Sequence, residues 1–435
     1  MKPAPPALRI WHPFTQAALD APPLRVVRGE GAHLILDDGG RVVDAISSWW
    51  VNIHGHGNPR IAAAIAAQAR KLEQVILAGF THDAAEELAQ RLRKWLPAEL
   101  THMFFSDDGS TAVEVALKLA VQYWSNLGRA ERSEIVALEH GYHGDTAGAM
   151  SVSDDSPFTA AFRGMRFPAH RVHSAYCHRC PVGLKRESCG IECAASLEKL
   201  LGERGERIAA VIVEPLLQGA GGMIVHPVEF LQKVRELCTR HGVLLIADEV
   251  LTGFGRTGKM FACEHAGIAP DLMCLSKGLT AGFLPMALTL TTERVEAAFR
   301  SEDRLRTFFH GHSFTGNALG CAAACASLQI FEDEPVFERI AGIAGIHAER
   351  LARLKEHAAV GEVRQIGTVA AVELRADDAG YLSSLRPRLY RFFRERGVLL
   401  RPLGNVIYVL PPYVIEPDEL HRVHDVVAEA IQTLL

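Results

Sequence analysis

The sequence predicts an α/β fold, with a large domain whose mainly parallel central sheet lies between helices and a small α+β domain formed by both termini. Two runs, Ala209–Val213 and Gly242–Ala247, are apolar throughout, and each is followed by an acidic residue. Continuous apolar strands are buried on both faces, which is typical of a parallel sheet covered by helices. Between about 58 and 335 such runs alternate with helical patterns, whereas short strand-like pieces occupy both ends of the chain.

The N-terminal segment is expected to form short strands followed by a helix. Strand-like pieces, separated by Gly-rich turns, lie at 24–28, 33–36 and 42–44. Asn58 and Pro59 then open an Ala-rich helix that runs to about Val75, with Asn as N-cap and Pro at the first helical position.

Three parts of the chain follow from this pattern. Residues 1–57 are expected to contribute to the small domain and to a substrate pocket, and 58–335 to form the large domain. Residues 336–435 would complete the small domain, with strands at Gly367–Glu373 and Val406–Leu410.

Composition excludes several classes of function. The chain has 435 residues, 48% hydrophobic content and a net charge of −5, with no block of Lys and Arg, so a nucleic-acid or anionic-membrane surface is not expected. No run of about eighteen apolar residues and no signal-peptide pattern occurs. Nine cysteines, an odd number in a long chain, do not suggest a disulfide scaffold. We therefore expect a cytoplasmic protein.

Two residues at predicted strand ends suggest a cofactor. Lys277 lies between small residues after the apolar stretch 271–275, and Asp248 ends a buried strand. An exposed loop lysine and a strand-end aspartate that caps a turn are the simpler interpretations. Pyridoxal phosphate (PLP), however, requires both an amine for its aldehyde and a carboxylate beside its pyridine nitrogen.

A phosphate site and an aromatic wall would complete such a pocket. Gly109, Ser110 and Thr111 precede a helical pattern at 112–124, where backbone N–H groups and hydroxyls could bind an anion. Ordinary capping by serine would explain the start of the helix equally well. Tyr142, flanked by glycines, is either a packed turn residue or a face on which a flat cofactor stacks.

Together these residues resemble the class III aminotransferases, PLP-dependent enzymes of fold type I. The motifs that carry the resemblance run in the family's order along nearly the whole chain: Asp108-Gly109-Ser110, Gly141-Tyr142-His143-Gly144, Glu214-Pro215, Asp248–Gly258 and Ser276-Lys277-Gly278.

The resemblance implies a role for each residue of the cofactor pocket. Lys277 would be the Schiff-base lysine and the proton carrier, and Asp248 would hold the pyridine nitrogen. Tyr142 would stack on the ring and touch the substrate. Gly109 and Ser110 would bind the phosphate, and no metal is expected in the catalytic site.

A second implication is a homodimer with shared active sites. The stretch 310–317 is similar to a family segment that reaches into the neighbouring subunit. Ser313 would then bind the partner's phosphate, with His312 and Gly311 beside it. An unliganded loop histidine is the alternative for His312.

Within the class, the chain is most similar to members that transfer an amino group to 8-amino-7-oxononanoate in biotin biosynthesis, usually from S-adenosylmethionine. Trp11–Thr15, Ser47–Trp50 and Arg401–Gly404 carry this similarity. An aromatic wall and one distal arginine suit a long apolar substrate that ends in a carboxylate. The implied substrate-binding residues are Phe14, Trp49, Tyr142, Asp145, Lys277, Gly311 and Arg401.

Two positions bear on the substrates. Phe14 stands where members that use adenosylmethionine often have tyrosine, so lysine remains an alternative amino donor. Ala220 replaces a glutamate with which many ω-aminotransferases mask the carboxylate-binding arginine, so Arg401 should stay free for carboxylates. A generic ω-amino acid:pyruvate aminotransferase is the other alternative.

Four cysteines form two close pairs outside these motifs, in the pattern Cys177-x2-Cys180-x8-Cys189-x3-Cys193. They are reduced loop cysteines, ligands of a structural zinc ion, or disulfide partners. The sequence leaves these three alternatives open.

Overall fold

The computed structural model describes residues 10–435, and its centre is a seven-stranded sheet of order β4-β12-β11-β10-β7-β5-β6. β10 pairs in parallel with β7 and β11, and β5 in parallel with β6 and β7, whereas β12 runs antiparallel between β11 and β4. The predicted, mainly parallel sheet is therefore confirmed. Its strands are β4 (Leu100–Ser106), β5 (Glu134–Leu138), β6 (His170–Val172), β7 (Ile208–Val213), β10 (Leu244–Asp248), β11 (Leu272–Leu275) and β12 (Ala287–Thr292).

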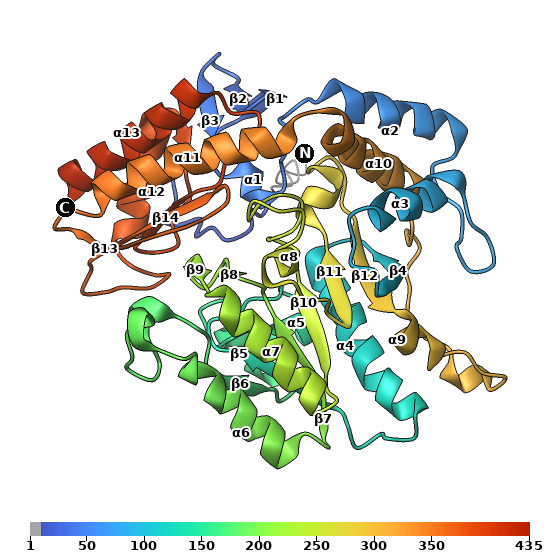
Figure 1. Ribbon diagram of the computed structural model, residues 1–435. Helices are drawn as coiled ribbons and strands as arrows, with labels where there is room; N and C mark the ends of the chain where they lie inside the picture. Colours follow the sequence, from blue (N-terminus) through green and yellow to red (C-terminus); the bar gives the residue numbers. More distant parts are fainter. Residues whose placement is uncertain (1–9) are drawn as a thin grey trace, which may run out of the picture.

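Helices cover both faces of this sheet (Figure 1). α4 (Gly109–Asn126) and α5 (Ala147–Val152) pack on the face that presents Ile212 and Ile246. α6 (Ala195–Arg204) and α7 (Val228–Arg240) pack on the face that presents Val211, Val213 and Leu245. Because neighbouring residues of a strand point to opposite faces, this burial explains why the strand sequences are apolar throughout.

The two ends of the chain meet in a smaller part of the fold (Figure 1). β15 (Val398–Leu399) adds in parallel to β3 (Arg41–Asp44), which continues through β2 (His33–Leu36) to β1 (Val26–Glu30). A second, three-stranded sheet consists of β13 (Val360–Ile366), β14 (Val369–Leu374) and β16 (Val406–Val409). α11 (Val336–Leu354) packs against β13 and β14, α12 (Leu385–Glu395) packs against β15, and α13 (Pro417–Leu434) packs against both helices. The domain limits at 57 and 335 remain a prediction.

The helix after Asn58 begins as predicted but ends earlier. Asn58 Oδ1 accepts hydrogen bonds from the backbone N of Arg60 (3.0 Å) and of Ile61 (3.4 Å), and Pro59 is the first residue of α2. α2 (Pro59–Lys71) stops four residues before the expected Val75, since Leu72 is extended. It packs against α10 (Ala318–Asp333), as does α3 (Asp83–Arg93).

The remaining elements are short. They are α1 (Ser47–Trp50), α8 (Cys263–Ala266), α9 (Glu293–Ala297), β8 (Leu217–Gln218), β9 (Ile224–Val225), and the 3-10 turns η1 (Ala160–Met165), η2 (Cys177–Arg179), η3 (Arg186–Ser188), η4 (Glu192–Ala194), η5 (Lys277–Thr280) and η6 (Arg304–Arg306). Across residues 10–435, no helix has the length and apolar character needed to cross a membrane.

Candidate active site

A cavity of about 370 Å³ opens where β10 and β11 end at their carboxyl termini. This edge is where open α/β sheets bind ligands. The predicted cofactor residues Gly109, Ser110, Tyr142, Asp248 and Lys277 all line this cavity.

Lys277 is the first residue of η5, directly after Ser276 at the end of β11. Its Nζ lies 4.5 Å from the centre of the Trp50 ring. Burial is the main cause that lowers the pKa of Lys277 to about 8, and the carboxylates of Asp248 and Glu214 oppose it. A larger share of this amine is therefore neutral near pH 7 than of an ordinary lysine.

Asp248 is paired with His143, a residue for which no role was predicted. Nδ1 of His143 lies 2.7 Å from Oδ2 of Asp248, and their side chains are only 1% and 6% exposed. Asp248 Oδ1 also accepts a hydrogen bond from the backbone N of Val250 at 3.1 Å. His143 thus fixes the orientation of the carboxylate, and its place beside Tyr142 in the Gly-Tyr-His-Gly motif was the available signal.

The start of α4 provides an anion site. Asp108, rather than Ser110, is the N-cap, since its side chain accepts a hydrogen bond from the backbone N of Thr111 at 3.0 Å. Ser110 Oγ instead accepts from the backbone N of Asp145 at 3.0 Å. A Cβ on Gly144, which has φ of +126°, would lie 1.9 Å from Ser110 Oγ. Glycine is therefore required at position 144, and Gly109 and Ser110 at the start of α4 line the cavity.

These features fit PLP. A buried carboxylate faces a cavity that also contains one lysine of lowered pKa and the N-terminus of a helix. His143 Nε2 is buried and has no hydrogen-bond partner among the described residues. Glu214 is also buried, and burial raises the pKa of its carboxyl to about 7, although the backbone N of Tyr142 and of Gly219 donate to it.

A second cavity of about 220 Å³ adjoins the first, and Trp50, Tyr142 and Lys277 line both. Five predicted substrate residues that are far apart in the sequence line it. Its lining residues are Phe14, Trp49, Trp50, Tyr142, Phe158, Ala220, Lys277, Tyr381, Arg401, Pro402, Leu403 and Tyr408. Phe158 and Tyr381 were not predicted.

Arg401 and the N-terminal arm meet at the far end of this cavity. Arg401 Nη2 donates a hydrogen bond to the Phe14 carbonyl oxygen at 2.9 Å, and its guanidinium lies 5.1 Å from the centre of the Trp49 ring. The Phe14 ring packs edge-on against Trp49 (5.2 Å) and Phe158 (5.9 Å). The arm is therefore part of the pocket, whereas Trp11 is 93% exposed.

Trp49 and Trp50 are presented by a left-handed turn. The four residues of α1 have φ values of 52°, 44°, 73° and 76°, and none is glycine. One local and one long-range hydrogen bond hold the turn: Ser48 Oγ donates to Asp44 Oδ2 (2.7 Å), and Trp50 Nε1 donates to the Tyr408 hydroxyl (3.1 Å). Such strain persists only where the surroundings impose it, and here it directs both indoles towards the cavities.

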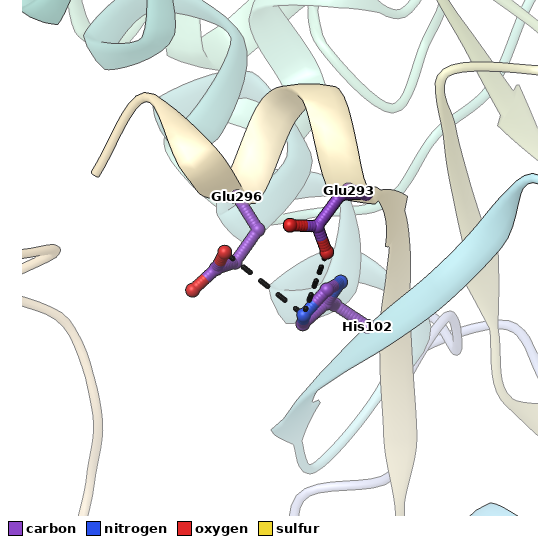
Figure 2. Close-up of side chains that lie close together, drawn as sticks. All are labelled: His102, Glu293 and Glu296. Carbon is purple, nitrogen blue, oxygen red and sulfur yellow. Dashed lines mark ion pairs between the residues drawn. The ribbon is translucent and has the colours of Figure 1, made fainter. Parts of the chain in front are cut away.

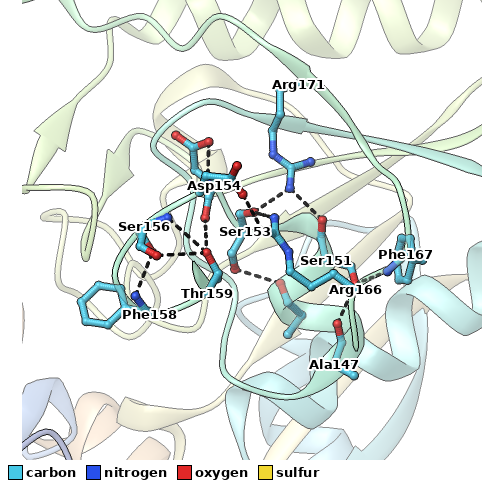
Figure 3. A network of polar contacts seen from close by, with 12 residues as sticks. Ala147, Ser151, Ser153, Asp154, Ser156, Phe158, Thr159, Arg166, Phe167 and Arg171 are labelled. Carbon is cyan, nitrogen blue, oxygen red and sulfur yellow. Dashed lines mark hydrogen bonds and ion pairs between the residues drawn. The ribbon is translucent and has the colours of Figure 1, made fainter. Parts of the chain in front are cut away.

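A polar network fixes the loop that carries Phe158 (Figure 3). Thr159 Oγ1 donates to the Asp154 carbonyl (3.1 Å), and Arg171 Nη2 donates to the carbonyls of Ser151 (2.7 Å) and Ser153 (2.6 Å). These bonds hold Phe158 in position between the arm and Tyr142.

Other predicted residues lie outside both cavities. Gly311, His312 and Ser313 are exposed, and His312 Nδ1 lies 3.4 Å from Oδ2 of Asp107 at the cavity wall. Asp145 is exposed beside Tyr142; burial, followed by this carboxylate, raises the pKa of the Tyr142 hydroxyl well above its ordinary value. The substrate and partner roles of these residues remain predictions.

Comparison with known proteins places the chain in a family. The sequence model of the class III aminotransferase family matches residues 15–431. Proteins named adenosylmethionine-8-amino-7-oxononanoate aminotransferase from Geobacter sulfurreducens and Synechococcus elongatus are 45% and 49% identical, covering 98% of this chain and 96% and 99% of theirs.

Solved structures agree. The crystal structure of the enzyme of that name from Methanocaldococcus jannaschii has a TM-score of 0.91 at 37% identity, covering 97% of this chain and 96% of the other. A PLP-bound amine transaminase from an uncultivated Pseudomonas species has a TM-score of 0.92 at 33% identity, covering 98% and 99%. The chain therefore belongs to the class III aminotransferases, PLP-dependent enzymes of fold type I.

Proposed function

We propose that this enzyme transfers an amino group to 8-amino-7-oxononanoate, giving 7,8-diaminononanoate for biotin biosynthesis, with S-adenosylmethionine as donor. The observation that carries the proposal is the aromatic cavity that extends from Lys277 to Arg401. Its length and apolar walls suit a long aliphatic keto acid, and Arg401 suits the terminal carboxylate. The names of the relatives support the same substrate.

PLP would be held at three points. Asp248, oriented by His143, would face the pyridine nitrogen, and Tyr142 would contact the ring. The start of α4 at Gly109 and Ser110 would hold the phosphate. When bound, the cofactor supplies an electron sink for the substrate carbon that loses its proton.

Lys277 would carry the proton. Lys277 lines both the cofactor cavity and the substrate cavity, as do Trp50 and Tyr142. Its pKa of about 8 lets Nζ accept and return a proton near neutral pH. Nζ would take the proton from the substrate carbon that bears the amine. The aromatic side chains around it exclude water, which would otherwise compete for the same proton.

The keto acid would lie along Trp49 and Phe158, with its carboxylate at Arg401. Arg401 is pre-positioned by its hydrogen bond to the Phe14 carbonyl and by the Trp49 ring. Ala220 contributes only a methyl group to this wall, so no acidic side chain at that position competes for the guanidinium. This arrangement favours a substrate with a distal carboxylate.

The donor is tested by direct comparison. Purified enzyme is supplied with 8-amino-7-oxononanoate and adenosylmethionine, lysine or alanine, and diaminononanoate is measured by mass spectrometry. We expect the highest kcat/KM with adenosylmethionine. A higher kcat/KM with lysine would change the assigned donor but not the assigned acceptor. If no donor gives diaminononanoate and the enzyme transfers amino groups to pyruvate, a generic ω-aminotransferase is favoured.

We also propose a cytoplasmic homodimer with shared active sites. Residues 311–314 are exposed, and Phe309 (71%) and Phe314 (62%) are large exposed apolar side chains of the kind that occurs at interfaces. Mixing inactive Lys277→Ala chains with inactive Ser313→Asp chains should restore part of the activity, because one of the two mixed sites is intact. Activity in a monomeric fraction would refute shared sites.

A further inference from the structure

Four cysteines gather around one small cavity at the surface of the segment between β6 and α6. They are Cys177 in η2, Cys180 directly after it, Cys189 directly after η3, and Cys193 in η4; we call them the cysteine cluster. All four line a cavity of about 20 Å³ whose other walls are largely apolar. Residues up to sixteen positions apart in the sequence thus present their thiols to the same space.

The chemistry of this cavity suits a metal ion. About 10–15 Å³ is enough to hold one water molecule, so the space accommodates a single small ion. Four thiols in two close pairs are the ligand set of structural zinc sites, which are tetrahedral and closed to solvent. We propose that the cysteine cluster binds one structural Zn²⁺.

Elsewhere in the described residues, no equivalent site is found. Among residues 10–435, one group of His, Cys, Asp or Glu has three ligand atoms within 4.8 Å of one another: His102, Glu293 and Glu296 (Figure 2). Arg300 already pairs with Glu293 at 2.8 Å and with Glu296 at 2.5 Å, so a cation would have to displace a guanidinium. That group is also partly exposed to solvent.

Zinc binding requires the sulfur atoms of the cysteine cluster to move closer together. No three of them lie within 4.8 Å of one another, whereas the sulfurs around a zinc ion at about 2.3 Å are roughly 3.8 Å apart. Little opposes that movement. Cys177 Sγ makes only a 3.8 Å contact to the Ala175 carbonyl, and Cys189 Sγ only a 3.9 Å contact from Arg186. Rotation of these side chains on their short turns would bring the sulfurs together around the ion.

The protons and charges of the reaction balance. Each thiol loses one proton as its sulfur binds, so one Zn²⁺ and four thiols give a tetrathiolate complex of charge −2 and four protons. Arg186 Nη1, 3.9 Å from Cys189 Sγ, offsets part of that charge. No oxidant or reductant takes part.

The ion would stabilise a connection between the large sheet and the C-terminal sheet. Next to Cys177, the Tyr176 hydroxyl donates to Glu373 on β14 at 2.8 Å and accepts from Arg364 on β13 at 3.2 Å. Arg179, between the first two cysteines, pairs with the same Glu373. Because β14 pairs with β16, which carries Tyr408 of the substrate cavity, the zinc ion would be a structural support for that wall.

Metal analysis of the holoenzyme tests the proposal. Protein purified under reducing, chelator-free conditions should contain about one zinc ion per chain, as measured by elemental mass spectrometry. Cys180→Ser and Cys189→Ser should each lose most of this zinc and lower the melting temperature, whereas Cys325→Ser, in the buried α10, should keep it. Co²⁺ exchanged into the site should show thiolate-to-metal charge transfer and tetrahedral bands.

Three results would overturn the proposal. One is a reduced wild-type protein that contains no zinc and takes up none from a zinc-buffered solution. Another is zinc retained by both variants. The third is a pair of disulfides within the cysteine cluster, detected by alkylation and peptide mapping without reductant. Should a variant fail to fold, the zinc content and the Co²⁺ spectrum of the wild-type protein still decide.

Discussion

Replacing Arg401 should selectively remove recognition of the substrate carboxylate. Within residues 10–435 its guanidinium makes one hydrogen bond, from Nη2 to the Phe14 carbonyl, so the second N–H of Nη2 and its neighbour on the same edge of the guanidinium remain to bind a carboxylate through two donors. A charged hydrogen bond contributes about 1.5–3 kcal/mol, and water partly replaces the lost pair. For Arg401→Ala we expect a loss of about 3 kcal/mol, a fall of roughly 150-fold in kcat/KM for the keto acid.

The assay must separate carboxylate binding from a collapse of the pocket. kcat/KM is measured for 8-amino-7-oxononanoate and for the matching amino ketone that lacks the carboxylate. Arg401→Ala should affect only the first, and Arg388→Ala, which removes an exposed arginine bonded to the Leu434 carbonyl, should affect neither. An equal loss for both substrates, or a loss below about threefold for the keto acid, would refute the assigned role.

Three further predictions concern the cofactor site and the left-handed turn. Because only neutral Lys277 reacts with PLP and its pKa is about 8, cofactor loading of the apoenzyme should slow about tenfold per pH unit below pH 8 and level off above it, as followed by absorbance. In denaturant titrations, the free energy of unfolding of Ser48→Gly should be about 1–2 kcal/mol higher than that of Ser48→Ala. Both variants lose the bond to Asp44, but only glycine relieves a φ of 44°. Gly144→Ala should weaken PLP binding at least tenfold in a fluorescence titration, whereas Gly342→Ala, which meets no atom within 4 Å, should not.

The cofactor end of the site could be predicted from sequence because it is built at the ends of regular elements. Asp248 ends β10, and Lys277 follows Ser276 at the end of β11, so an apolar run followed by a polar residue locates each. The pairing of His143 with Asp248 could not be found in this way, since the two residues are 105 positions apart. Only the folded loop brings them together.

The substrate end could be predicted only by resemblance. A left-handed turn at Ser-Ser-Trp-Trp contradicts local preferences, since none of its residues is glycine. It forms because Ser47 Oγ donates to the Leu410 carbonyl (2.8 Å) and Trp50 Nε1 to the Tyr408 hydroxyl, partners 363 and 358 positions away. Phe158 likewise depends on the network of Figure 3. Such long-range contacts cannot be read from the periodicity of the sequence.

This division between the two ends predicts the effect of Phe14→Tyr. Phe14 lines the 220 Å³ cavity but not the 370 Å³ cavity, and its contacts are with Trp49, Phe158 and Arg401. A hydroxyl added to its ring enters the substrate space and offers one more hydrogen bond to a donor molecule. The ratio of kcat/KM for adenosylmethionine to that for lysine should therefore change, while the PLP dissociation constant stays the same. Loss of PLP from the variant would mean that the arm supports the cofactor site, and the two ends of the pocket would not be independent.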